Sequence, residues 1–160
     1  MTKLELYEIS ESYDDITPEE CDEVLSTCGC FNLRKASRAV TQFYDEILQP
    51  TGFRATQLTV LFALGEAQEL SLTKLAHMLV VSPSTLSRNL RPLERDGYVE
   101  IVNKGKREKS VTLTEDGIAA LSEAKPYWSK AQLKFTSLIG DDRWEELSER
   151  LDQTVELIRR

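Results

Sequence analysis

The chain has 160 residues, enough for one domain with a buried core, and 41% of them are hydrophobic, which is ordinary for a globular protein. No stretch approaches the roughly 18 consecutive apolar residues of a membrane span, and the first residues lack the basic and apolar blocks of a signal peptide, so we expect a cytoplasmic protein with no membrane partner. The net charge of −7 is by itself the wrong sign for a protein that binds phosphate.

The acidity is concentrated at the N-terminus. Residues 1–24 hold nine carboxylates and one lysine, a balance of −8, so that residues 25–160 carry a net charge of +1. We therefore predict a separate acidic segment over residues 1–16 and a single domain over residues 17–160. The charge of the acidic segment does not decide what the domain binds.

A long helix is predicted over residues 17–49. Thr17-Pro18-Glu19-Glu20 forms a capping box with proline at the first helical position, and the break Pro50-Thr51-Gly52 ends the helix. No cysteine pair on one continuous helix of this kind has the geometry of a disulfide, so free thiols are expected. The three cysteines are Cys21, Cys28 and Cys30.

The central part of the chain predicts a helix-turn-helix. After a helix over 54–66, Ser71 can cap a short helix, and only Val80 and Val81 separate that helix from Ser82. Ser82 followed by Pro83 is a favoured helix start. Two helices joined so tightly are typical of a helix-turn-helix unit.

The helix that starts at Pro83 has two chemically different faces. At about 100° per residue, leucines 86, 90 and 93 form one narrow stripe, while Ser84 and three arginines lie on the opposite side. The pattern fits a solvated surface helix, but also a helix that offers donors to phosphates and guanine edges in a DNA major groove.

A charged β-hairpin is predicted next. Asp96-Gly97 ends the helix, the run 98–102 is β-prone, residues 103–109 make the turn, and 111–113 return. Residues 82–113 hold seven basic and four acidic side chains, a local balance of +3. The predicted DNA contacts are Ser82, Ser84, Thr85, Ser87, Arg88, Arg91, Arg95, Lys104, Lys106, Arg107 and Lys109.

Residues 114–160 are predicted to be helical, with Thr114 as a cap and a last helix from Asp141 or Asp142. The last helix has an apolar seam for another helix at Trp144, Leu147, Leu151, Val155 and Ile158. We expect a homodimer joined by the segments 17–49 and 114–160, with 54–113 as the DNA-binding part. Two recognition helices would then lie about 34–36 Å apart and call for a palindromic operator on double-stranded DNA.

Three motifs resemble the MarR family of winged helix-turn-helix transcriptional regulators: GFRATQLTVLFAL (52–64), SPSTLSRNLRPLERDGYV (82–99) and KREKSVTLTEDG (106–117). The resemblance implies a mainly α fold with a β-hairpin wing, dimerised through its N- and C-terminal helices. It also implies a repressor that a small-molecule or oxidant signal releases from DNA. Gly105 stands where the family wing usually has an aspartate two residues before its arginine, here Arg107.

Two kinds of signal remain open from the sequence. Cys30 and Tyr44 match a reactive cysteine and a tyrosine of the peroxide-sensing OhrR branch, but Arg34 replaces a second tyrosine there; a free cysteine on a helix can equally be a small core residue. The alternative is a small aromatic or anionic inducer in a cleft lined by Arg34, Arg38, Tyr44 and Trp128.

Other functional classes have less support. The single histidine, His77, has no catalytic partner or glycine-rich loop nearby, and one histidine with three dispersed cysteines makes no zinc spacing. We therefore expect no enzyme activity, no metal and no cofactor. A winged helix that only binds proteins is the remaining alternative, although three outward arginines argue against it.

Overall fold

A computed structural model describes residues 16–105 and 109–159. The chain forms two compact units, Met1–Ala39 and Val40–Arg160, which are treated separately below. In the first unit, helix α1 (Pro18–Thr27) is followed by the start of helix α2 (Gly29–Leu48), which continues into the second unit. None of the described residues of the first unit is buried.

The long helix predicted over 17–49 is divided in two. The Thr17 capping box is confirmed, with Glu20 N donating to Thr17 Oγ1 at 3.2 Å, but the extended backbone of Cys28 ends α1 (φ −65°, ψ 112°). Ser26 and Thr27 both donate to the Glu23 carbonyl, and such local bonds compete with helix continuation. The assumption of one continuous helix through the three cysteines was therefore wrong.

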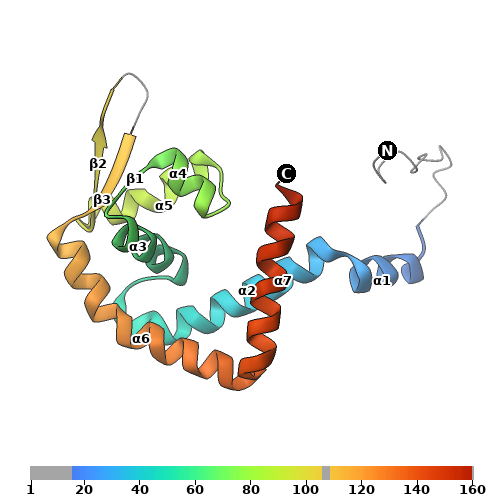
Figure 1. Cartoon of the computed structure of the whole chain (residues 1–160). Helices are drawn as coiled ribbons and strands as arrows, with labels where there is room; N and C mark the ends of the chain where they lie inside the picture. Colours follow the sequence, from blue (N-terminus) through green and yellow to red (C-terminus); the bar gives the residue numbers. More distant parts are fainter. Residues whose placement is uncertain (1–15, 106–108, 160) are drawn as a thin grey trace. The chain divides into compact units, whose positions relative to one another are not determined.

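The second unit contains the rest of α2 and all remaining elements (Figure 1). They are a 3₁₀ turn η2 (Gln49–Thr51), α3 (Ala55–Ala67), β1 (Glu69–Ser71), α4 (Leu72–Met78), α5 (Pro83–Arg95), β2 (Val99–Asn103), β3 (Lys109–Leu113), α6 (Glu115–Ile139) and α7 (Asp141–Ile158). The helix-turn-helix, the hairpin and the last helix lie where the sequence predicts them. No described helix is long and apolar enough to cross a membrane.

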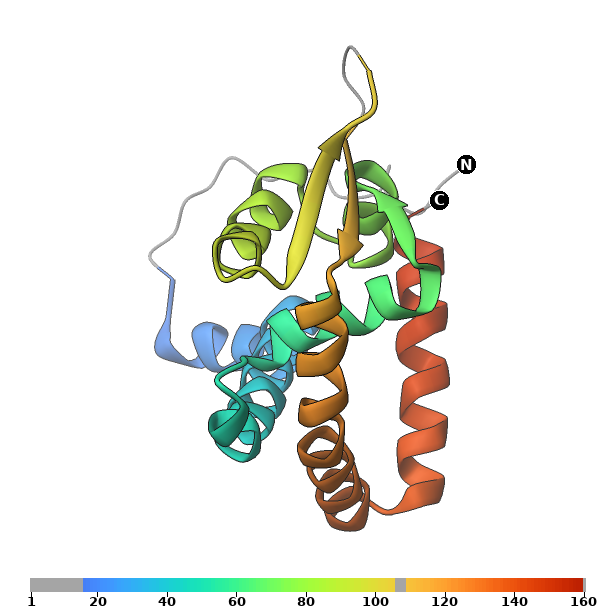
Figure 2. The same ribbon diagram turned by 90° about the vertical axis from the view of Figure 1, so that its left-hand side faces the viewer.

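The sheet has one strand more than the sequence predicts. Its order is β1-β3-β2 with both pairings antiparallel, and Figure 2 shows β1 beside β3 at the base of the hairpin. Leu70 pairs with Val111 and Ile101 pairs with the same Val111 from the other side. Three residues are too few to show an alternating pattern, so β1 had no signal in the sequence.

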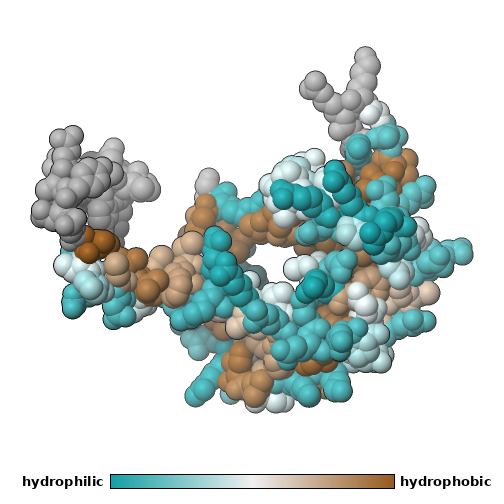
Figure 3. Space-filling model, turned by 180° about the vertical axis from the view of Figure 1, so that it is seen from behind, coloured by the Kyte–Doolittle hydropathy of each residue, from teal (hydrophilic) through white to brown (hydrophobic). Residues whose placement is uncertain are grey.

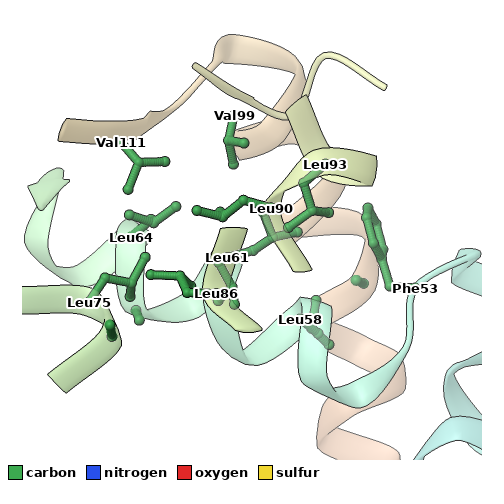
Figure 4. Close-up of a cluster of buried hydrophobic side chains, with 14 of the residues drawn as sticks. Phe53, Leu58, Leu61, Leu64, Leu75, Leu86, Leu90, Leu93, Val99 and Val111 are labelled. Carbon is green, nitrogen blue, oxygen red and sulfur yellow. The ribbon is translucent and has the colours of Figure 1, made fainter. Parts of the chain in front are cut away.

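The predicted leucine stripe of α5 forms the centre of the core. Leu86, Leu90 and Leu93 are each 1% exposed or less, and they point towards side chains of α3 and of the sheet (Figure 4). Burying a leucine fully contributes about 1.5–3 kcal/mol, so this stripe fixes which face of α5 points outwards. Their labelled neighbours in Figure 4 include Leu58, Leu61, Leu64, Leu75, Val99 and Val111.

An aromatic cluster joins α2, α6 and α7 within the second unit. The Phe135 ring lies 5.8 Å from the Tyr44 ring and 5.0 Å from the Trp144 ring, measured between centroids. At the other end of α7, Arg159 Nη1 donates to the His77 carbonyl of α4 at 2.8 Å. Both ends of α7 therefore have a contact with the rest of this unit.

Candidate nucleic-acid interface

The N-terminus of α5 gathers three of the predicted contact residues. Ser82 caps the helix by accepting from Thr85 N at 3.1 Å, and its hydroxyl lies 2.9 Å from the hydroxyls of both Ser84 and Thr85. Ser87 is one turn further on and donates to the Pro83 carbonyl. All four side chains are exposed. Exposed hydroxyls at a helix start, together with its free N–H groups, suit a negatively charged partner.

The three arginines of α5 differ in their surroundings. Arg88 and Arg91 are exposed, and neither has a carboxylate partner among residues 16–105 and 109–159. Arg95 instead makes a bidentate pair with Asp96, with bonds of 2.8 and 3.1 Å, and the pair raises the pKa of Arg95 and lowers that of Asp96. Two cations of the helix are thus available to an external anion, while the charge of the third is compensated.

The basic residues of the hairpin also differ in whether a carboxylate neutralises them. Lys109 is exposed and has no carboxylate partner in the described part of the chain, whereas Lys104 forms an ion pair with Glu69. The hydrogen bond from Lys104 and the charge of Lys104 lower the pKa of the Glu69 carboxyl. The other two predicted wing contacts, Lys106 and Arg107, lie outside the described residues.

The turn between α4 and α5 contains a strained residue. Val80 has φ +54° and is exposed, although a β-branched side chain is unfavourable in this left-handed region. The backbone is held by hydrogen bonds on both sides of the turn, from Val80 N to His77 O and from Val81 N to Ala76 O. This short connection sets the angle at which α5 leaves α4.

The candidate sensing residues fall into two groups. Tyr44 and Trp128 line one cavity of about 190 Å³ in the second unit, with Val40, Thr41, Leu48, Ala55 and Thr59. Tyr44 Oη donates to Gln132 Oε1 at 2.5 Å, and burial raises the pKa of Tyr44. Cys30, Arg34 and Arg38 are exposed residues of α2 in the first unit. The described residues contain no group of three metal-ligating side chains that could hold a metal ion.

Sequence reasoning missed the partners of two carboxylates. Asp45 accepts from Ala55 N at 2.7 Å and from Arg54 Nη1 at 3.1 Å, so a residue of α2 caps the start of α3. Asp45 and its partner Ala55 belong to different helices, and Glu69 lies on β1, for which the sequence makes no prediction. Hydrophobic periodicity carries no information about such pairs.

Comparison with known proteins decides the family. The sequence model of the MarR family matches residues 53–102. An HTH-type transcriptional regulator of Bacillus cereus is 30% identical over 121 residues, which cover 76% of this chain and 79% of that protein. The chain belongs to the MarR family. The resemblance drawn from the motifs is therefore confirmed, as is the mainly helical winged-helix fold.

Two further relatives of this MarR-family protein are informative. The regulator MosR of M. tuberculosis, solved in complex with DNA, is 34% identical and matches with a TM-score of 0.72 over 83% of this chain and 99% of that one. The organic hydroperoxide resistance regulator of Bacillus subtilis is 31% identical over 90 residues, 55% of this chain and 61% of that protein. MarR-family proteins are DNA-binding regulators of transcription, so the expectation that this chain is no enzyme is confirmed.

Proposed function

We propose that this MarR-family regulator is a cytoplasmic repressor that binds a palindromic operator as a homodimer and is released by a small signal. The observation that carries the proposal is the outer face of α5, where Arg88 and Arg91 are exposed without carboxylate partners in the described chain, beside the hydroxyls of Ser82, Ser84 and Thr85. Such a helix has its N-terminus and its donors on the face that enters the major groove in helix-turn-helix proteins.

Unpaired apolar surface supports the dimer. Neither α1 nor α7 has a buried residue, although α1 exposes Val24 and Leu25, and α7 exposes Leu157 and Ile158. A groove of about 510 Å³ is lined by Phe43, Leu133, Lys134, Ser137 and Leu138. Figure 3 shows apolar surface where α6 turns into α7. Exposed patches of this kind usually mark interfaces, and a second copy covers them most simply.

Sedimentation equilibrium tests this arrangement. The wild type is expected to be a dimer and to place two chains on each palindromic fragment selected from random DNA. Leu138→Glu puts a charge on a side chain that is 75% exposed, so it should leave the fold intact, dissociate the dimer and reduce operator binding at least tenfold. Ile118→Glu, at 56% exposure on α6, is the matched control. A monomeric wild type that binds DNA as one chain would contradict the proposal.

For the signal we favour the cavity beside Tyr44 and Trp128. Its volume of about 190 Å³ is small beside the roughly 300–1,000 Å³ of drug-sized sites, so it suits a compact aromatic acid. The Trp128 ring packs edge-on against Phe62 with centroids 5.5 Å apart, and the Tyr44 hydroxyl provides a polar group in the wall. Small aromatic or anionic inducers combine an apolar part with a polar group, which match the aromatic rings and the hydroxyl of this cavity.

Oxidation of Cys30 is the second candidate, supported by its exposure and by the identity to the hydroperoxide regulator. An organic hydroperoxide should then release DNA from the wild type and from Cys21→Ser but not from Cys30→Ser. Benzoate, used as a probe of the cavity, should release DNA from all three proteins. Equal release of the wild type and Cys30→Ser by peroxide would contradict sensing by Cys30, and no response to any aromatic acid would contradict the cavity.

A further inference from the structure

The carboxylate of Glu69, on the first strand, lies on the face of the sheet that also carries Lys104 at the start of the hairpin turn. Glu69 of β1 pairs with Thr112, Val102 of β2 pairs with Ser110, and side chains alternate between faces along a strand. Glu69, Ser110 and Lys104 therefore belong to one face, with β3 between the two charged residues. Ser110 is only 4% exposed, whereas the side chains of Glu69 and Lys104 are 41% and 49% exposed.

The contact joins the two outer strands of the sheet. Glu69 Oε1 and Lys104 Nζ form an ion pair across β3, and Lys104 directly follows β2, where the hairpin leaves the sheet. An exposed pair contributes little to stability. The pair instead affects geometry and charge. It connects β1 to the point where the hairpin leaves the sheet, and it neutralises Lys104.

We propose that Glu69 is a positioning residue of the wing, which braces the hairpin through Lys104 and keeps this lysine from acting as a phosphate contact. The proposal rests on the proposed function, in which the wing lies against DNA. If Lys104 moved to a phosphate, the Glu69 carboxylate would remain unpaired beside a polyanion. Whether Lys104 binds Glu69 or a phosphate, the two side chains together carry no net charge. They therefore add nothing to the number of counterions released from DNA.

The salt dependence of DNA binding separates this brace from a simple contact. Each lysine that neutralises a phosphate adds about 0.9 to the slope of log K against log salt. Because a dimer carries each substitution twice, Lys109→Gln should therefore reduce the slope by about 1.8. Glu69→Gln should increase it, because Lys104 is freed, and the double variant Glu69→Gln with Lys104→Gln should return to the wild-type slope.

An unchanged slope for Glu69→Gln, or a loss of about 1.8 for the double variant equal to that for Lys109→Gln, would overturn the brace. A measurement without DNA decides it independently. Carbon NMR of the Glu69 carboxyl should give a lowered pKa in the wild type and a higher one in Lys104→Gln; identical titrations would also overturn it. A wild type that binds no DNA would contradict the proposed function, while the NMR result would still decide the ion pair.

Discussion

Replacing Gly117 with alanine is expected to reduce the free energy of unfolding by about 3 kcal/mol. Gly117 lies in the first turn of α6, and a Cβ there would lie 3.0 Å from the Tyr98 carbonyl carbon and closer still to its oxygen. That carbonyl cannot easily move, because it accepts from Thr114 N at 3.1 Å, while the Thr114 hydroxyl donates to the Gly97 carbonyl at 2.6 Å. The overpacking outweighs the helix propensity gained, about 1 kcal/mol.

Thermal unfolding measures this effect. A loss of that size lowers Tm by roughly 6–12 °C in a chain of this length. Gly65→Ala is the control, since its new Cβ would meet only flexible leucine side chains, the nearest atom being Leu121 Cδ2 at 3.1 Å. If Gly117→Ala melted at the same temperature as the wild type, the close approach of α6 to the Tyr98 carbonyl, directly before β2, would be wrong.

Arg88→Ala is expected to weaken binding to the selected operator by roughly 5- to 150-fold for each half-site, the equivalent of about 1–3 kcal/mol for each bidentate base contact. Arg88 is exposed on the outer face of α5, one turn after Ser84, and no carboxylate in the described chain compensates it. Binding to unrelated DNA should change much less, because base contacts rather than phosphate contacts carry the discrimination. Fluorescence anisotropy on both fragments measures the ratio.

Arg95→Ala is the matched control on the same helix. Its guanidinium is already paired with Asp96, so its removal should reduce operator affinity less than Arg88→Ala does. A uniform loss on operator and unrelated DNA for Arg88→Ala would make Arg88 a phosphate contact. No loss on either fragment would show that α5 does not face DNA.

Much of the helix-turn-helix and of the hairpin could be predicted because the sequence signals for them are local. The serine and threonine caps at 71, 82 and 114 each accept the expected backbone hydrogen bond, and the 3.6-residue period of leucines 86, 90 and 93 fixes the buried face of α5. These features depend on neighbours within four residues. Family motifs in the same segment then lead to the function.

Features that depend on distant partners could not be predicted. The break at Cys28 is local, but weak helix formers around Gly29 do not by themselves reveal it, and Asn32 Nδ2 donates to the Ser26 carbonyl across the break. Strand β1 exists only because β3 provides its partner, and the pairing of Lys104 with Glu69 follows from that strand. The sequence therefore gives a list of basic residues, but not which of them are already neutralised.

Methylation interference on an operator selected from random DNA tests the central claim most directly, because guanine N7 lies in the major groove. If α5 of each subunit reads that groove, methylation should block binding in two clusters whose centres lie about 10 base pairs apart. Arg88→Ala should weaken the interference at one guanine in each cluster. Interference confined to adenine N3 in the minor groove, or a single cluster on the fragment, would contradict a dimer that reads DNA through α5.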